Sequence, residues 1–240
     1  MSEISQRELE ALRHEFEPLI GLRIDWLSVP GQALKGFEPS QIAVIINTLL
    51  DAIMPQVEFL ASDPENAEKL HHIGLSKSPS RFGERESYPD YIHRSGKRFE
   101  LKGLFVDNPD LTLKRPPTKR EPSSRLKENI TVEDVDPSND VLLVAAVQLK
   151  EIDGRCYPVI IDVGLFPMAQ SIRARDSRLT ESGGKWIKGI PCVVSKRGRK
   201  KLKRGEPLTD EDYEKDTNFG KLKRIPYAPL QEFMRKHGAI

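Results

Sequence analysis

Cysteine is scarce in this chain of 240 residues, with only Cys156 and Cys192 present. Two cysteines cannot form a disulfide framework, and neither stands in a Cys-X-X-Cys or Cys/His spacing that would bind zinc. We therefore expect both to be small, buried, apolar side chains. Neither a disulfide-rich class nor a zinc-binding class fits the sequence.

Long apolar runs and a strong excess of one charge are also missing. The longest apolar stretch, Ile42 to Met54, is interrupted by Asn47, Thr48 and Asp51 and is shorter than a membrane span requires. The first residues, MSEISQRELEALRHEF, are charged and lack the apolar core of a signal peptide. The net charge of +2 is too small to indicate a particular class of partner. We expect a cytoplasmic protein that does not contact a membrane.

Motifs of several common enzyme classes are absent. The sequence has no GxxxxGK(S/T) phosphate-binding loop, so nothing in it indicates an ATP-driven motor. It also has no GxSxG or catalytic-cysteine signature, so no acyl-transfer enzyme is indicated.

Helical patterns dominate the first part of the chain. Ser5 and Glu8 have the spacing of a capping box at the start of a first helix. Apolar periodicity predicts a longer helix from Pro39 to about Ala61, which Pro55 kinks or ends. Asp63-Pro64-Glu65 is typical of the cap and first turn of another short helix.

From residue 71 the pattern changes to that of strands. We expect strands at His71–Ser76, Ser87–His93, Arg98–Val106, Asp140–Lys150 and Tyr157–Phe166. The last two are apolar enough to be covered on both faces of a sheet. Pro167 can open a helix that runs to about Leu179. The polar, proline-rich excursion from Asn108 to Asn139 has the length of a functional or mobile loop.

This order of elements predicts the α/β class, with a central mixed β-sheet flanked by helices. We expect one domain over residues 1–240, made of a helical part at 1–65, a core at 66–180 and a basic, irregular part at 181–240. Trp26 and Trp186 are expected in the core.

The most informative stretch is a predicted hairpin between residues 87 and 103. Arg94-Ser95-Gly96 suits a three-residue turn with Gly96 in the left-handed conformation. Position 93 then faces 97, so Asp90 lies opposite Glu100, and directly opposed side chains share one face of a sheet. Alternation places Lys102 on the face of Glu100, while Phe99 and Leu101 point into the core.

Two opposed carboxylates repel each other unless a positive charge lies between them. Mg²⁺ takes oxygen ligands and commonly uses one or two carboxylates together with waters and substrate phosphate. Lys102 can orient or activate a water and offset charge on a pentavalent phosphorus. The arrangement is therefore suited to phosphodiester cleavage.

The same residues carry a family resemblance. Pro89-Asp90, nine residues, and then Glu100-Leu101-Lys102 is similar to the PD-(D/E)XK signature of the restriction-endonuclease-like nuclease superfamily. The resemblance covers about residues 40–180 and implies a restriction-endonuclease-like core. It implies that Asp90 and Glu100 bind Mg²⁺, that the backbone carbonyl of Leu101 adds a ligand, and that Lys102 assists the attacking water.

Members of this family often add an acidic residue from the preceding helix. Here the candidates are Asp51, Glu58, Glu84 and Glu86, and the sequence does not choose among them. Asp162 is unusual inside an apolar strand. It is either a buried, hydrogen-bonded residue or one at an exposed strand end, and a catalytic role is the minor alternative.

Basic residues cluster in the long loop, in the run from Lys196 to Arg204, and at Lys221, Lys223 and Arg224. Such runs are often only solvated, but beside a nuclease-like hairpin they favour phosphate contact. Arginines on the helix after residue 167 are surface charges by default, with a further phosphate or base contact as the alternative. The residues predicted to contact DNA are Lys119, Arg120, Arg125, Arg173, Arg175, Lys196, Arg197, Arg199 and Lys200. The acidic stretch from Glu206 to Asp216 is expected to face away from DNA.

The leading hypothesis is a Mg²⁺-dependent type II restriction endonuclease that hydrolyses double-stranded DNA at a specific sequence. The resemblance also implies a homodimer. One alternative is a repair, junction-resolving or transposon-end nuclease of the same fold. Another is a non-catalytic nucleic-acid-binding protein, in which Asp90 and Glu100 are surface charges.

Overall fold

A six-stranded sheet in the order β1-β6-β5-β4-β3-β2 forms the centre of the computed structural model, which describes residues 3–25, 28–79, 88–114 and 124–240. The parallel pair is β4 and β5, and the other neighbours are antiparallel. The predicted mixed sheet of the α/β class is therefore confirmed. The strands are β1 (Val29–Pro30), β2 (Leu75–Lys77), β3 (Tyr91–His93), β4 (Arg98–Val106), β5 (Asp140–Ile152) and β6 (Arg155–Pro167).

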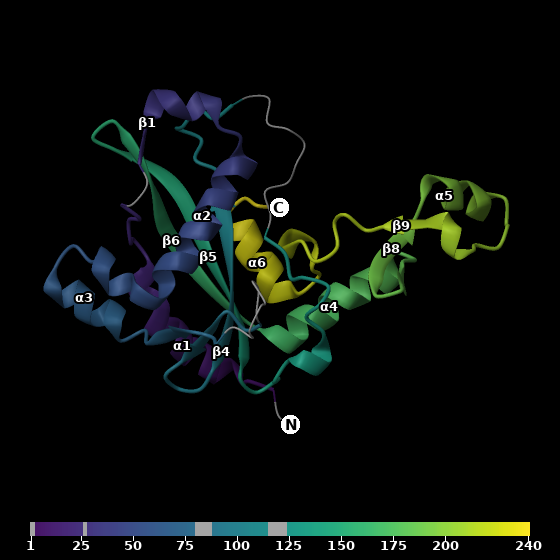
Figure 1. Cartoon of the computed structure of the whole chain (residues 1–240), viewed down its shortest axis with the longest axis horizontal. Helices are drawn as coiled ribbons and strands as arrows, with labels where there is room; N and C mark the ends of the chain where they lie inside the picture. Colours follow the sequence, from purple (N-terminus) through teal and green to yellow (C-terminus); the bar gives the residue numbers. More distant parts are fainter. Residues whose placement is uncertain (1–2, 26–27, 80–87, 115–123) are drawn as a thin grey trace.

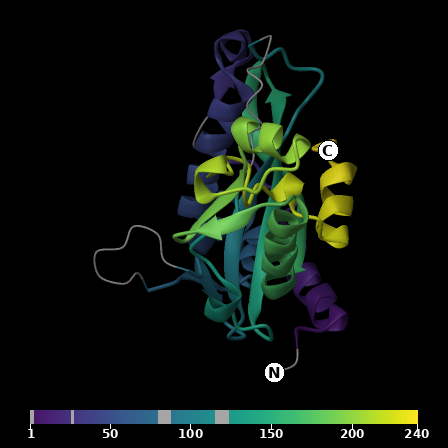
Figure 2. The same cartoon turned by 90° about the vertical axis from the view of Figure 1, so that its right-hand side faces the viewer.

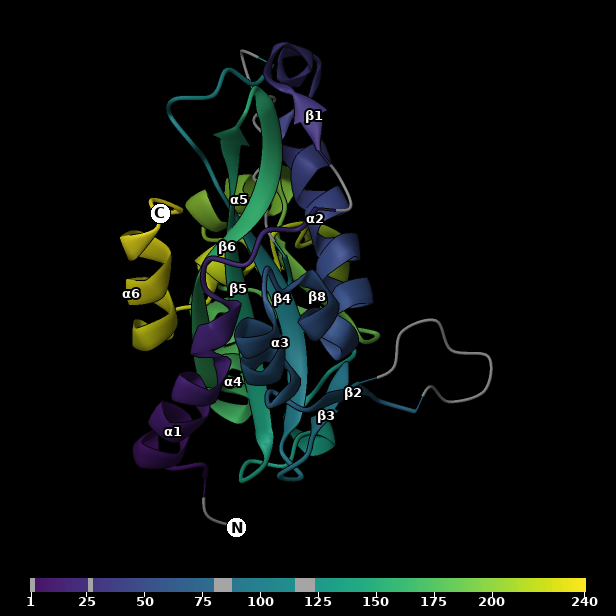
Figure 3. The ribbon, with the colours of Figure 1, turned by 90° about the vertical axis from the view of Figure 1, so that its left-hand side faces the viewer.

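Helices cover both faces of this sheet (Figure 3). One face carries α1 (Gln6–Phe16), α2 (Pro39–Ile53) and α3 (Pro64–His71) over one apolar cluster. The other carries α4 (Met168–Glu181) and α6 (Ala228–Lys236) over a second. The 3-10 turns are η1 (Glu17–Leu19), η2 (Gly31–Gly36), η3 (Met54–Leu60), η4 (Val132–Asp134), η5 (Asp210–Asp212) and η6 (Leu222–Arg224).

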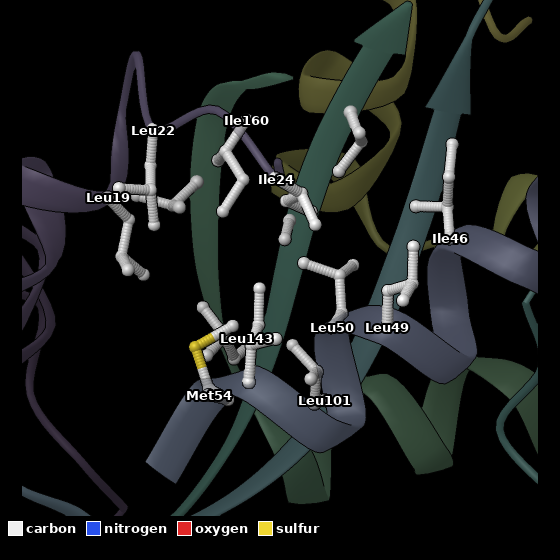
Figure 4. Packing of buried hydrophobic residues seen from close by; sticks show 14 of the residues in the cluster. Leu19, Leu22, Ile24, Ile46, Leu49, Leu50, Met54, Leu101, Leu143 and Ile160 are labelled. Carbon is white, nitrogen blue, oxygen red and sulfur yellow. The ribbon is translucent and has the colours of Figure 1, made fainter. Parts of the chain in front are cut away.

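Helix α2 packs against the sheet through its apolar face. Ile46, Leu49 and Leu50 are buried, and they point toward strand residues that include Leu101 and Leu143 (Figure 4). Full burial of such a side chain stabilises the fold by about 1.5–3 kcal/mol. The helix gives way to η3 with a kink whose backbone is non-helical at residue 56, directly after the predicted break.

The segment Pro39–Leu60 is, by length and composition alone, apolar enough to cross a membrane. The core helix of a soluble protein passes the same test, and the buried residues of α2 belong to the sheet-facing cluster. The cytoplasmic location stays a prediction.

Most elements expected from apolar patterns are confirmed. Ser5 and Glu8 form the predicted capping box of α1. The short helix predicted near residue 64 is α3, and the helix predicted after residue 167 is α4. The three long strands agree with their predicted bounds to within two residues. Cys156 and Cys192 are free and buried, as expected.

Two strand predictions need correction. His71–Ser76 is not a strand, because α3 continues through His71 and only Leu75–Lys77 pairs with β3. The strand predicted at Ser87–His93 begins at Tyr91, while residues 80–87 lie outside the described part of the chain.

The region after residue 181 is not irregular. It forms a second, three-stranded sheet of β7 (Lys185–Ile187), β8 (Ile190–Val194) and β9 (Tyr213–Lys215), with α5 (Lys196–Lys203) inserted between β8 and β9. We call residues 185–215 the arm, because they extend from the end of α4 away from the main sheet (Figures 1 and 2).

One side chain of the arm corrects a further prediction. Trp186 is 42% exposed and meets Phe219 edge-on, so it does not belong to the core. Trp26 lies outside the described residues.

Candidate active site

The hairpin of β3 and β4 has the predicted register. Position 91 pairs with 99 and position 92 with 98, which places Asp90 across from Glu100. Gly96 occupies the left-handed region with φ of 82°. Phe99 and Leu101 are buried in the cluster under α2, and Glu100 points the other way. This part of the prediction is confirmed.

Strand β3 is too short to cover all of β4, and the site lies where the coverage ends. Asp90 precedes β3, and its Oδ2 accepts the Leu101 N–H over 2.7 Å. Further along the same edge, Asn47 Oδ1 accepts the Gly103 N–H over 2.9 Å, and Ser124 Oγ donates to the Gly103 carbonyl over 2.6 Å. Side chains thus replace a neighbouring strand along this edge.

The uncovered edge forms the floor of a cavity of about 520 Å³. Helix α2 supplies one wall, and the described end of the long loop supplies another. The excursion from residue 108 to 139 is therefore partly a wall of the site, as a functional loop would be. The lining residues are Asn47, Thr48, Asp51, Lys77, Tyr88, Asp90, Glu100, Leu101, Lys102, Ser124, Arg125, Lys127, Asn129 and Ile130.

Lys102 contacts the other two residues of the predicted motif and the Leu101 backbone. Its Nζ donates to Glu100 Oε1 over 2.6 Å and to the Leu101 carbonyl oxygen over 2.9 Å, and it lies 3.8 Å from Asp90 Oδ2. The ammonium therefore contacts or approaches three of the oxygen atoms that the sequence resemblance assigns to a metal.

Burial disfavours the ionised form of the two carboxyl groups, Asp90 and Glu100. It raises the pKa of Glu100 to about 7, although Lys102 opposes the shift, and the charge of Asp90 adds to it. Burial also raises the pKa of Asp90, against the opposing effects of Lys102 and of the Leu101 N–H. A pair of carboxyls perturbed in this way inside a cleft is a common property of functional sites.

Asp51 is the acidic residue that α2 contributes to the cavity. Partial burial would raise its pKa, but hydrogen bonds from Lys77 and Tyr91 outweigh that effect and lower it. Tyr91 Oη donates to Asp51 Oδ1 over 2.7 Å, and the ammonium of Lys77 forms an ion pair with the same oxygen. Asp51 is therefore held charged.

Of the other acidic candidates, Glu58 lies 3.6 Å from His71 and is not among the cavity-lining residues. Glu84 and Glu86 lie outside the described residues. Of the two interpretations of Asp162, the structure shows the first: its side chain is buried and hydrogen-bonded. Its carboxylate accepts from residues of α1 and the C-terminal segment, namely Arg13, Lys236 and His237.

Asp90, Glu100 and the Leu101 carbonyl have the donor chemistry of a hard-cation site. Among the described residues, no group of three His, Cys, Asp or Glu side chains is close enough to hold a metal by itself. Mg²⁺ does not need one, because one or two carboxylates with waters and phosphate suffice. The buried Oε2 of Glu100 has no hydrogen-bond partner among the described residues, which a bound cation would supply.

The residues predicted to contact DNA separate into different groups. Arg125 lines the cavity, and Arg173 lies on the surface of α4 in an ion pair with Glu3. Arg175 is 1% exposed and donates to the carbonyls of residues 127 and 130, so its burial is at odds with the predicted DNA contact and we do not retain it. Lys119 and Arg120 lie outside the described residues.

The remaining four predicted contacts, Lys196, Arg197, Arg199 and Lys200, lie on α5 in the arm. The acidic stretch does not simply face away from them. Asp212 is buried against α5 and accepts from Arg197 Nε over 2.8 Å and from Lys201 Nζ over 2.7 Å.

Sequence reasoning missed several cavity residues. Asn47 is one of them, although it interrupts the same apolar run as the candidate Asp51 and lies four residues before it, so helical periodicity could have placed both on one face. Lys77 and Ser124 in the lining, and the buried Tyr91 that supports Asp51, carry no local signal of their role, because their contacts join segments far apart in the sequence.

No protein-family model, curated protein or solved structure matches this chain.

Proposed function

We propose that the protein is a Mg²⁺-dependent endonuclease that hydrolyses phosphodiester bonds of double-stranded DNA. The observation that carries the proposal is the convergence of Asp90, Glu100 and Lys102 on the uncovered edge of β4, inside one cavity. Two carboxylates with an adjacent ammonium suit phosphoryl transfer, where positioning and charge stabilisation supply most of the catalysis.

Asp90, Glu100 and the Leu101 carbonyl would hold the cation, and Asp51 is the acidic residue placed to add a direct or water-mediated contact. When bound, Mg²⁺ would lower the pKa of a water and offset charge on a phosphate oxygen. The hydrogen bond from the Leu101 N–H fixes Asp90 in place, so the carboxylate is positioned before any ligand arrives.

Lys102 is the residue that we assign to the attacking water and the reacting phosphate. Its ammonium now bonds Glu100 and the Leu101 carbonyl. Neutralisation of those oxygens would release its N–H groups toward the substrate. There it would orient the water and stabilise the extra negative charge of the pentavalent phosphorus.

Duplex DNA is the substrate that best fits the surroundings. Lys77, Arg125 and Lys127 join Lys102 among the cavity-lining residues, so cations flank the carboxylates where phosphates would enter. A type II restriction enzyme is the branch we favour, and in a homodimer each chain would cut one strand with its one site. Size-exclusion chromatography with light scattering would test for the dimer.

The test is incubation of the purified protein with phage-sized duplex DNA in Mg²⁺ and in EDTA. We expect discrete fragments in Mg²⁺ only, and no cleavage by Asp90→Asn, whose amide oxygen can still accept the Leu101 N–H. Cutting of branched DNA alone would favour a junction or repair enzyme. Intact DNA in every divalent metal, with DNA binding retained, would overturn the catalytic proposal.

A further inference from the structure

The cations of α5 form one stripe. Lys196, Arg199, Lys200 and Lys203 stand at positions i, i+3, i+4 and i+7, and all four are exposed. At about 100° per residue these positions fall within roughly 100° of arc on one side of a helix. The stripe therefore presents four positive charges in one direction.

The opposite side of α5 is fixed to the rest of the arm. Gly198 approaches so closely that a Cβ there would lie 2.4 Å from the Asp212 carbonyl oxygen. Asp212 binds Arg197 and Lys201, and its Oδ2 also accepts the Thr209 N–H over 2.9 Å. These two cations are thus used internally, and their bonds set the direction in which the stripe faces.

The stripe persists against local electrostatics. Like charges at i+3 and i+4 spacing destabilise a helix by about 0.2–0.5 kcal/mol per pair. The helix dipole also disfavours Lys196 in the first turn, although it favours Lys200 and Lys203 in the last turn. Within the described residues none of the four stripe residues has an ion pair, whereas Arg197, Lys201 and Arg204 all do. A polyanion facing the stripe would relieve this repulsion.

The base of the arm is joined to the cavity wall. Leu126 N–H donates to the Gly220 carbonyl over 2.8 Å, and Arg125 Nη2 donates to the Thr217 carbonyl over 2.7 Å. Lys215 at the end of β9 lies 3.4 Å from Glu128. The wall formed by residues 124–130 and the turn at residues 217–220, which follows the arm, therefore hold each other in place.

We propose that the stripe of Lys196, Arg199, Lys200 and Lys203 binds the phosphate backbone of duplex DNA outside the segment held in the cavity. This inference rests on the proposed function, since it takes DNA as the ligand. Such contacts are independent of base sequence and add affinity and register. Leu202 is the single apolar side chain of α5, so the helix lacks the apolar face of a membrane-surface helix.

The experiment measures binding of a fluorescent duplex in EDTA over a range of salt concentrations, so that cleavage plays no part. The test variant is K196Q/R199Q/K200Q/K203Q. The matched control, K35Q/K69Q/K150Q/R235Q, removes the same charge from exposed positions outside the arm. Circular dichroism checks that both remain folded. We expect the slope of log Kd against log salt to fall by about 3 to 4 in the test variant and to change little in the control.

The outcomes separate the arm from the catalytic site. Equal salt slopes for the test variant and the control would overturn the role of the stripe, even if the wild type cuts DNA. Loss of binding to anionic lipid vesicles with unchanged DNA binding would also overturn it. A reduced slope in a protein that cuts no DNA would support the stripe and count against the nuclease proposal alone.

Discussion

Lys102 Nζ lies 2.6 Å from Glu100 Oε1, so the ammonium meets the carboxylate that we expect to bind a cation. It also bonds the Leu101 carbonyl. A protein cation on these oxygens competes with Mg²⁺, and its removal should leave metal binding intact or tighter.

Lys102→Met should therefore separate metal binding from catalysis. We expect cleavage to slow by about 10²–10³-fold, the usual loss when one donor that stabilises transition-state charge is removed. The Mg²⁺-induced rise in Tm should be retained or occur at lower Mg²⁺. Lys150→Met, at an exposed position outside the cavity, is the control. Wild-type cleavage rates in Lys102→Met would remove Lys102 from the mechanism.

The raised pKa of Glu100 predicts a pH dependence of the metal-free protein. Burial, with the charge of Asp90, raises that pKa from 4.5 to about 7. The folded state therefore keeps a proton that the unfolded chain has lost, so the free energy of unfolding should fall as pH rises across this interval. Asp90, whose pKa burial also raises, acts in the same direction.

Urea unfolding in EDTA, repeated between about pH 4.5 and 7, measures this dependence. Glu100→Gln should show a smaller decline and should be at least as stable as wild type near neutral pH, because it buries no charge. It should also lose most of the stabilisation by Mg²⁺. Parallel wild-type and Glu100→Gln profiles would contradict the assignment.

The core of the site was predictable because its determinants are local. The turn at Gly96 and strand alternation together set the register, so the opposition of Asp90 and Glu100 followed from a few neighbouring residues. The long strands could also be predicted from sequence, since β5 and β6 are apolar over most of their length. Helix α5 could not be predicted in this way, because its eight residues contain only one apolar side chain and therefore show no apolar periodicity.

The parts that could not be predicted depend on contacts between distant segments. Asp51 and Glu58 looked equivalent in sequence, but α2 ends at Ile53 and the chain kinks at Gln56, so Asp51 lines the cavity and Glu58, in η3, does not. Arg175 looked like a surface cation of α4, but the folded loop supplies carbonyl acceptors and Phe219 stacks against its guanidinium. Such pairings arise from three-dimensional packing and leave no periodic signal.

Tyr91→Phe tests how Asp51 is held. The phenol donates to Asp51 Oδ1 over 2.7 Å and to its carbonyl over 2.9 Å. Loss of this bond costs about 1 kcal/mol, and we expect Mg²⁺ affinity to fall by roughly fivefold if Asp51 contacts the metal. Asp51→Ala should weaken Mg²⁺ binding further. Tyr157→Phe, at a residue outside the cavity lining, is the control and should leave Mg²⁺ affinity unchanged. Unchanged Mg²⁺ titrations by calorimetry for Asp51→Ala would exclude the contact.

The approach of α2 to β4 at Gly103 explains how Asp51 reaches the cavity. A Cβ on Gly103 would lie 2.3 Å from Asn47 Oδ1 and 3.0 Å from Leu50 Cδ1. Asn47 and Asp51 are one helical turn apart, so any displacement of the helix at Asn47 also moves Asp51.

Gly103→Ala should therefore lower the free energy of unfolding by about 1–3 kcal/mol through overpacking and weaken Mg²⁺ binding as well. The matched control is Gly36→Ala, where an added Cβ meets nothing within 4 Å. Urea unfolding and Mg²⁺ calorimetry measure the two effects. If Gly103→Ala behaves like Gly36→Ala in both, the close approach of α2 does not position Asp51. If stability falls while Mg²⁺ affinity stays unchanged, the approach serves the fold alone.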